Sequence, residues 1–154
     1  MNRFFYLIGF LVALSACKEV YEAPPQSLVE AKFINSESET NAAISSNITV
    51  RGIGMEELWV KDTLLSGIIL PLSPEDTTRF LISFDSTVDT LTFVHDTFQK
   101  YDSMETGFYY EFKIKSVGFT HHRINDLEIT DSLVTKDWHE NIKLYIRPLP
   151  AGGN

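Results

Sequence analysis

The sequence predicts an all-β fold, an antiparallel β-sandwich of immunoglobulin-like architecture with about eight or nine strands. Short segments of alternating or β-branched residues follow one another along the chain, and turn residues separate them at intervals of roughly ten residues. No amphipathic helical pattern of any length interrupts them. With 11 Phe and 6 Tyr in 154 residues, the chain also has the apolar side chains that a folded core needs.

Nine segments carry the strand pattern, at residues 28–34, 48–53, 58–60, 67–70, 78–84, 89–94, 109–119, 126–129 and 141–146. The alternation is clearest at 109–115, where one face would be buried and the other wet. The side chains predicted to point inward there are Tyr110, Phe112 and Ile114, and those predicted to face water are Tyr109, Glu111, Lys113 and Lys115. In three other strands the predicted inward residues are Phe80, Ile82, Phe84, Leu91, Phe93, Ile142, Leu144 and Ile146.

Turn residues mark the strand ends. Residues 85–88 predict a hairpin turn that starts at Asp85. Because proline cannot donate to a strand ladder, the segment 67–70 is expected to end at Pro71. Gly52-Ile53-Gly54 has no helix after it, so it indicates a bulge or a turn rather than a phosphate-binding loop.

The N-terminal segment predicts a bacterial lipoprotein signal peptide at residues 1–16. Arg3 precedes an apolar run at 4–14, and Leu14-Ser15-Ala16-Cys17 follows as a cleavage site between Ala16 and Cys17. The run has 11 residues, whereas a transmembrane helix needs about 20. Cys17 would carry a thioether-linked diacylglycerol and an amino-terminal acyl chain such as palmitate, and anchoring is worth about 0.8 kcal/mol per buried methylene.

The alternative is an ordinary secretory signal that is cut after Ala16 and leaves Cys17 as a thiol. Cys17 is the only cysteine of the chain, so an internal disulfide is impossible. An unpaired thiol would be a liability in an oxidising compartment, which favours lipidation.

The mature chain is long enough for one domain with a sizeable core. Residues 17–27 are expected to form the lipidated cysteine and a flexible tether, because Pro24 and Pro25 lie in a stretch with little to bury. The sandwich would span 28–147, and 148–154 would be a disordered tail. Losing Arg3 leaves 12 Lys and Arg against 21 Asp and Glu, a net charge of −9 that argues against nucleic acid as a partner.

Most of the chain after Ala31 resembles an uncharacterised lipoprotein family of Bacteroidota, catalogued as domain of unknown function 6452. The resemblance rests on the order and spacing of six short motifs: Asp62-Thr63-Leu64-Leu65, Ile69-Leu70-Pro71-Leu72-Ser73-Pro74, Asp89-Thr90-Leu91-Thr92, Gly107-Phe108, Ile124-Asn125-Asp126-Leu127-Glu128-Ile129 and Asn141-Ile142-Lys143-Leu144-Tyr145. Members often carry cysteine pairs in the mature domain, and this chain has none to pair. The family has no assigned activity, so the resemblance implies a location and a fold and adds no chemistry.

No motif predicts a metal site, a cofactor site or catalysis. His121 and His122 are adjacent, and adjacent residues of a strand point to opposite faces, so a metal site with His95 and His139 is disfavoured. The acidic pairs at 56–57 and 75–76 are too isolated to bind calcium, and the EF-hand spacing is absent. There is no G-x-S-x-G motif and no second cysteine.

Seven of the nine Asp residues precede Ser or Thr, which resembles the Asp-Ser/Thr-hydrophobic acceptor triplet of O-glycosylation in Bacteroidota. The candidate acceptors are Thr63, Ser103 and Ser132, whereas Thr90 is expected to lie within a strand. The same dipeptide starts turns, which is the structural alternative.

The sequence therefore predicts an outer-membrane lipoprotein that is a non-catalytic, protein-interaction or structural accessory of the cell envelope. Its partners would be the bilayer, through Cys17, and an envelope protein. The alternative is a carbohydrate- or small-ligand-binding module with aromatics on one face; the candidates are Trp59, Trp138, Tyr101, Tyr109 and Tyr145. Lys18-Glu19 partly matches a surface-export signal, so the domain would face either the periplasm or the cell exterior.

Overall fold

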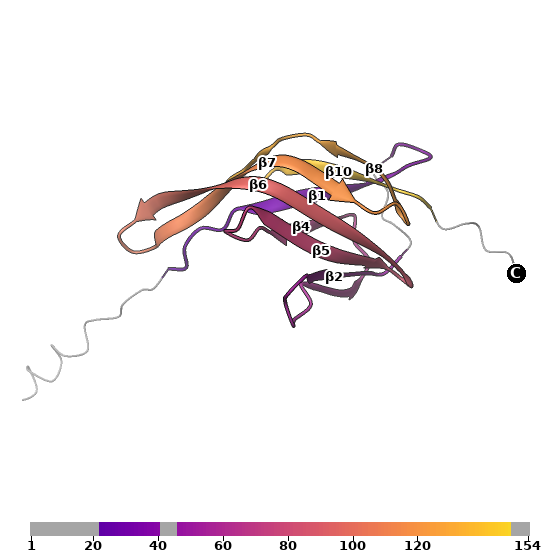
Figure 1. Cartoon of the computed structure of the whole chain (residues 1–154), viewed down its shortest axis with the longest axis horizontal. Helices are drawn as coiled ribbons and strands as arrows, with labels where there is room; N and C mark the ends of the chain where they lie inside the picture. The colour runs from indigo at the N-terminus through magenta and orange to yellow at the C-terminus, as the bar shows by residue number, and fades with distance from the viewer. Residues whose placement is uncertain (1–21, 41–45, 149–154) are drawn as a thin grey trace, which may run out of the picture.

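The computed structural model describes residues 22–40 and 46–148, which form two β-sheets packed face to face (Figure 1). The predicted all-β sandwich is confirmed. The strands are β1 (Leu28–Asn35), β2 (Ile48–Gly52), β3 (Val60–Thr63), β4 (Gly67–Pro71), β5 (Thr77–Phe84), β6 (Thr87–Ser103), β7 (Gly107–Phe119), β8 (Ile124–Ile129), β9 (Leu133–Val134) and β10 (Glu140–Ile146). The four-stranded sheet has the order β4-β1-β10-β8 and the six-stranded sheet the order β3-β2-β5-β6-β7-β9.

The predicted signal peptide, Ala16, Cys17 and all of the predicted tail except Pro148 lie outside the described residues. Within the described part of the chain, no helix has the length and apolar character of a membrane span.

The core lies between the sheets and is built from alternate residues of the facing strands. The predicted inward faces of β5 and β10 are confirmed, as are Leu91 and Phe93 on β6, since all of these side chains are buried. Two edge-to-face aromatic pairs contribute to its packing: Phe33 with Phe84 across the sheets, at 6.1 Å between ring centroids, and Phe80 with Phe93 within one sheet, at 6.2 Å.

One strand pair, β1 with β10, is parallel, and the other pairs of the described chain are antiparallel. The alternation of apolar and polar residues predicts which face of a strand is buried, but it does not predict whether the neighbouring strand runs parallel or antiparallel. On the other side of β1, the approach of β4 requires a glycine. A Cβ on Gly67 would lie 2.7 Å from the carbonyl oxygen of Ala31.

The predicted strand at 58–60 is wrong in its bounds, because β3 begins at Val60 and continues to Thr63. The apolar side chains of Leu58 and Trp59 belong to the loop before β3 instead. The Trp59 indole N–H donates to the carbonyl of Ile69, on β4 in the other sheet. β9, with only two residues, is absent from the predicted strands.

β6 is much longer than the predicted 89–94 and pairs with β7 over almost its whole length. β5 accompanies β6 only as far as Val94, and β9 pairs with β7 at Phe112 and Lys113. Residues 96–103 of β6 and 107–111 of β7 therefore form a two-stranded hairpin that projects from one end of the sandwich (Figure 1). We refer to this hairpin as the arm.

The arm overturns the predicted faces of two tyrosines. Tyr110, predicted to be buried, is 40% exposed, because the four-stranded sheet does not extend under the arm. Tyr109, predicted to face water, is only 9% exposed. The Nζ of Lys136 lies 5.6 Å from its ring centroid.

The turn at residues 120–123 carries the chain from β7 in one sheet to β8 in the other, and the buried carboxylate of Asp89 organises it. Oδ1 of Asp89 accepts hydrogen bonds from the Thr120 hydroxyl at 2.7 Å and the His122 backbone N–H at 2.9 Å. Oδ2 accepts from the backbone N–H groups of Arg123 at 2.7 Å and Ile124 at 3.0 Å. Burial raises the pKa of Asp89, but these hydrogen bonds outweigh burial and hold the pKa below its ordinary value.

Arg123, in the same turn, is itself buried and closes the end of the core. Its Nε donates to the carbonyl of Arg147 at 3.0 Å, and both terminal nitrogens lie 3.3 Å from the hydroxyl of Ser46. The guanidinium carbon lies 5.6 Å from the ring centroid of Phe84. Burial lowers the pKa of Arg123, while Asp85 and Asp89 act in the opposite direction.

We expect Asp89→Asn to lower the free energy of unfolding by about 2–4 kcal/mol, because an amide cannot accept from all of these donors and some N–H groups would stay buried without a partner. Urea denaturation measures the change. Asp137→Asn is the matched control, since it removes one carboxylate from an exposed position. A loss in Asp89→Asn no larger than in the control would contradict this role.

The same interaction has a pH signature. Because folding lowers the pKa of Asp89, its stabilisation is complete above the unfolded-state pKa of about 3.9 and is lost as the pH falls through the folded-state pKa. The unfolding free energy of Asp89→Asn should therefore fall less steeply below about pH 4 than that of the unsubstituted protein.

Candidate functional site

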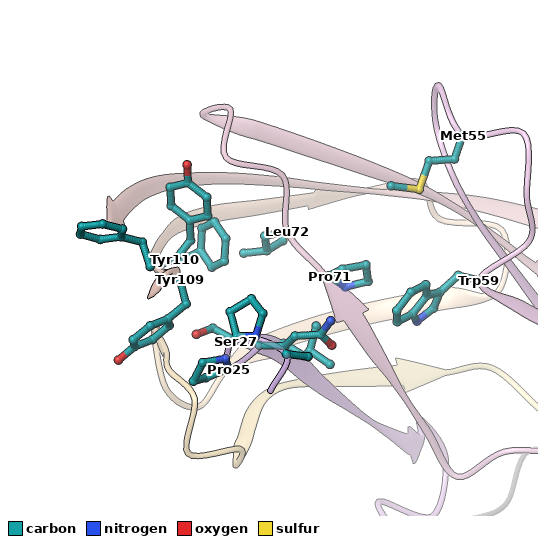
Figure 2. Close-up of a pocket in the computed structure, with 14 residues that line it drawn as sticks. Pro25, Ser27, Met55, Trp59, Pro71, Leu72, Tyr109 and Tyr110 are labelled. Carbon is teal, nitrogen blue, oxygen red and sulfur yellow. The ribbon is translucent and has the colours of Figure 1, made fainter. Parts of the chain in front are cut away.

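An apolar groove lies where the arm leaves the sandwich (Figure 2). Its volume is about 490 Å³. Four parts of the chain meet there: the N-terminal segment, the loop between β2 and β3, the end of β4 and the first half of β7. The residues that line it are Ala23, Pro24, Pro25, Gln26, Ser27, Leu28, Met55, Trp59, Pro71, Leu72, Phe108, Tyr109, Tyr110 and Phe112.

The N-terminal segment forms one wall of the groove. Pro24 and Pro25 are half-buried and have no N–H to satisfy, so they can pack against apolar neighbours without a hydrogen-bonding penalty. The Trp138 indole N–H donates to the carbonyl of Gln26 at 2.9 Å, which holds this segment against the loop before β10. Residues 24–27, predicted to belong to the flexible tether, therefore contact the sandwich.

Aromatic side chains from the arm form the opposite wall. Phe108 is 60% exposed, and its ring meets Tyr101 edge to face at 5.4 Å between centroids. Figure 2 shows Tyr109 and Tyr110 at one end of the groove and Met55 and Trp59 at the other, with Pro71 and Leu72 between them.

The polar groups of the groove are few. The Tyr109 hydroxyl donates to Glu111 at 3.0 Å. Burial and this hydrogen bond raise the pKa of Tyr109, so the phenol stays protonated at neutral pH. Ser27 is 6% exposed, and none of the described residues offers its hydroxyl a hydrogen-bond partner. The groove thus combines aromatic and aliphatic walls with one unpaired hydroxyl, an arrangement that suits an apolar group with a polar end.

A second apolar surface adjoins the groove at the edges of the two sheets. We call it the edge patch; it comprises Ile53, Met55, Leu58, Trp59, Leu64 and Ile69, which are 38–62% exposed. Met55 and Trp59 belong to both surfaces. β3 and β4 are terminal strands of their sheets, so each has one side without a strand partner among the described residues. The hydrogen bond from Trp59 to Ile69 joins the two edges.

The four histidines considered for a metal site have different surroundings, and the adjacent pair His121 and His122 contacts different neighbours. His95 is buried, and its Nε2 is 3.1 Å from the Thr78 hydroxyl; burial lowers its pKa. His139 pairs with Asp131 at 3.1 Å, and a hydrogen bond to the Asp137 carbonyl raises its pKa. His121 packs on Phe119, and His122 is beside Asp89. Within 22–40 and 46–148, no three His, Cys, Asp or Glu residues converge on a possible metal position.

The five aromatics considered for a carbohydrate platform do not all line one hollow of the described part of the chain. Only Trp59 and Tyr109 line the groove. Tyr101 lies on the arm, and Trp138 lies beside Gln26. Tyr145 lines a separate polar hollow of about 500 Å³, and its hydroxyl donates a hydrogen bond to Glu128.

The three candidate glycosylation residues lie in different settings. Thr63 is exposed at the end of β3, and its hydroxyl donates to the carbonyl of Lys61. Ser103 ends β6, and its hydroxyl is 2.7 Å from that of Thr106. Ser132 is half-buried between β8 and β9. Thr90 lies within β6 as predicted, and glycosylation of the other three stays a prediction.

The groove is not among the sites predicted from the sequence. The pattern at Pro24 and Pro25 indicates a tether, and Tyr109 and Tyr110 begin the predicted strand at 109–119, with Phe108 just before it. The available signal was that Phe108, Tyr109 and Tyr110 are consecutive: in a strand they cannot all face one core, so at least one aromatic must face outward.

We expect Ser27→Ala to raise the free energy of unfolding by about 1 kcal/mol, because it removes a buried hydroxyl that has no partner among the described residues. Ser46→Ala is the matched control: that serine is also buried but is bonded to Arg123, so its loss should lower stability by about 1–3 kcal/mol. Urea denaturation measures both. A loss of stability in Ser27→Ala would show that its hydroxyl is satisfied.

Comparison with known proteins identifies the domain without giving it an activity. No curated protein and no solved structure matches the chain. A family model described as a family of unknown function, DUF6452, matches residues 47–146, which include β2 to β10 and the whole arm. The chain therefore belongs to this family of unknown function.

Proposed function

We propose that the protein is exported, anchored in the outer membrane through acylated Cys17, and acts as a non-catalytic interaction or structural accessory of the cell envelope. The signal-like sequence at 1–17 supports the anchor. The domain would lie on the periplasmic face or at the cell surface. Its partner would be another envelope protein, in keeping with a chain whose net charge disfavours nucleic acid.

The observation that carries the protein-interaction role is the edge patch. Exposed apolar residues scattered singly are ordinary, but here four of them lie in the loop between β2 and β3, Leu64 directly follows β3, and Ile69 lies on β4, where Trp59 is bonded to it. The outer side of β3 can add backbone hydrogen bonds to an incoming strand, while the side chains of Leu64 and Ile69 provide apolar contact. The patch therefore has both elements of a strand-addition interface.

The test is affinity capture of the lipidated protein from detergent-solubilised native membranes, read by mass spectrometry. We expect one envelope protein to be enriched with the unsubstituted chain and lost with Leu64→Glu, because a charge buried within an apolar interface is left desolvated. Leu64 is 62% exposed, so the substitution should leave the fold intact.

Val88→Glu is the matched control, since Val88 is 45% exposed on β6, away from the edge patch. Cys17→Ser shows whether capture depends on the anchor. Equal recovery of the partner with Leu64→Glu and with Val88→Glu would rule out the edge patch as the contact.

A second candidate function, binding of a small ligand, is favoured by the groove and by the unpaired hydroxyl of Ser27. The predominantly apolar walls favour an aliphatic or aromatic compound over a sugar, since sugars require more hydrogen-bonding groups. Titration with a fluorescent fatty acid tests it: binding should be lost in Leu72→Trp, which fills the groove, and kept in Val88→Glu. Equal binding by both variants would exclude the groove.

A further inference from the structure

We propose that the tip of the arm inserts into the interface of the same bilayer that holds the lipid anchor. This inference rests on the proposed function, because it requires Cys17 to be acylated. It adds a second membrane contact, made by side chains, and it fixes which end of the sandwich faces the membrane.

The position of the tether supports this orientation. Figure 1 shows the N-terminal segment entering the sandwich at the end from which the arm projects, while the chain leaves at the other end. Ala23, which already lines the groove, follows Cys17 by six positions. Even fully extended, six residues span only about 20 Å, so the base of the arm must stay within about 20 Å of an anchor on Cys17.

The arm is long enough to cover this distance. Eight residues of β6, Asp96 to Ser103, lie beyond the last partner in β5. At about 3.3 Å per residue they extend about 25 Å. An arm that is as long as the tether and leaves the sandwich at the same end can reach the membrane surface.

The side chains at the tip suit a bilayer interface. Met104 is 91% exposed, Phe108 60% and Tyr101 58%, so the most exposed large apolar side chains of this end lie together around one turn. Aromatic rings are favoured at headgroup level, where the ring meets acyl chains and the hydroxyl meets water. Gly107 permits the tight turn, with a φ of +78°.

The polar side chains of Asp102, Ser103 and Thr106 near the tip are hydrogen-bonded within the protein, which lowers the cost of removing them from water. The Thr106 hydroxyl donates to Oδ2 of Asp102 at 2.7 Å, and Lys136 pairs with Oδ1 at 2.8 Å. On the arm, Lys100 pairs with Glu111, and at its base Asp96 pairs with Lys115 of the adjoining part of β7. The exposed Glu105 would stay among the headgroups, and with an acidic chain we expect contact with zwitterionic rather than anionic lipid.

The test places a nitroxide at the tip through Met104→Cys in the full lipidated chain. With Cys17 acylated, the introduced cysteine is the sole thiol. The protein is reconstituted into phosphatidylcholine vesicles, and collisions of the label with oxygen and with a water-soluble nickel chelate are compared. We expect a several-fold loss of nickel collisions at position 104 relative to Ser86→Cys, an exposed control in the turn just before β6. Adding Phe108→Ser should restore the nickel collisions at position 104, because it removes an exposed aromatic ring from the tip.

Equal nickel access at positions 104 and 86 in vesicles that float with the protein would overturn the insertion and leave the anchor standing. Protein that does not float with the vesicles would overturn the anchor and the insertion together. Protection of position 104 in native membranes but not in phosphatidylcholine vesicles that contain no other protein would show that the tip contacts another protein, and it would overturn the lipid contact.

Discussion

The carboxylate of Asp89 is the interaction on which the connection between the two sheets depends. Asp89 lies on β6 in one sheet, and its side chain is fully buried. The carboxylate accepts hydrogen bonds from the backbone N–H groups of Arg123 and Ile124, where the chain enters β8 in the other sheet. A turn between sheets leaves such N–H groups without ladder partners, and burying them unpaired would be costly. One side chain satisfies them, and the buried guanidinium of Arg123 then ties the same turn to Ser46 and to the carbonyl of Arg147.

This arrangement makes the two ends of the molecule different. At the Asp89 end, polar groups are buried and paired, and β6 has partners on both sides. At the other end β6 and β7 continue alone as the arm, and apolar side chains lie exposed around the groove and the tip. The two proposed contacts would use exposed apolar side chains: the edge patch would bind a protein partner, and the tip of the arm would bind the membrane.

Much of the fold could be predicted from the sequence, because period-two burial directly reports a strand that packs on a core. Phe80, Ile82 and Phe84 illustrate this, as do the inward residues of β10. Alternation does not reveal a strand where its side chains are not buried, or where distant residues bury them. The outer half of β6 has no core face, so its residues carried no signal, and Tyr109 is covered by Lys136, which is far along the chain. The parallel pairing of β1 with β10 leaves no trace in alternation.

The candidate site was less predictable than the fold for a related reason. The groove is assembled from four separate segments, and none of them has a recognisable motif. Asp89 itself stands out in the sequence only as part of a turn-like dipeptide, since its role depends on backbone donors more than 30 residues away. The family has no known function, so the proposed role of the domain rests on the groove, the edge patch and the arm.

The measurement that tests the central claim most directly is the intact mass of the protein purified from its native envelope. The proposal predicts the mass of residues 17–154 plus a diacylglycerol and an acyl group on Cys17, with a further glycan mass for each of Thr63, Ser103 and Ser132 that is glycosylated. The bare mass of residues 17–154, or that of the uncut 154-residue chain, would contradict the lipid anchor and with it the role proposed at the membrane.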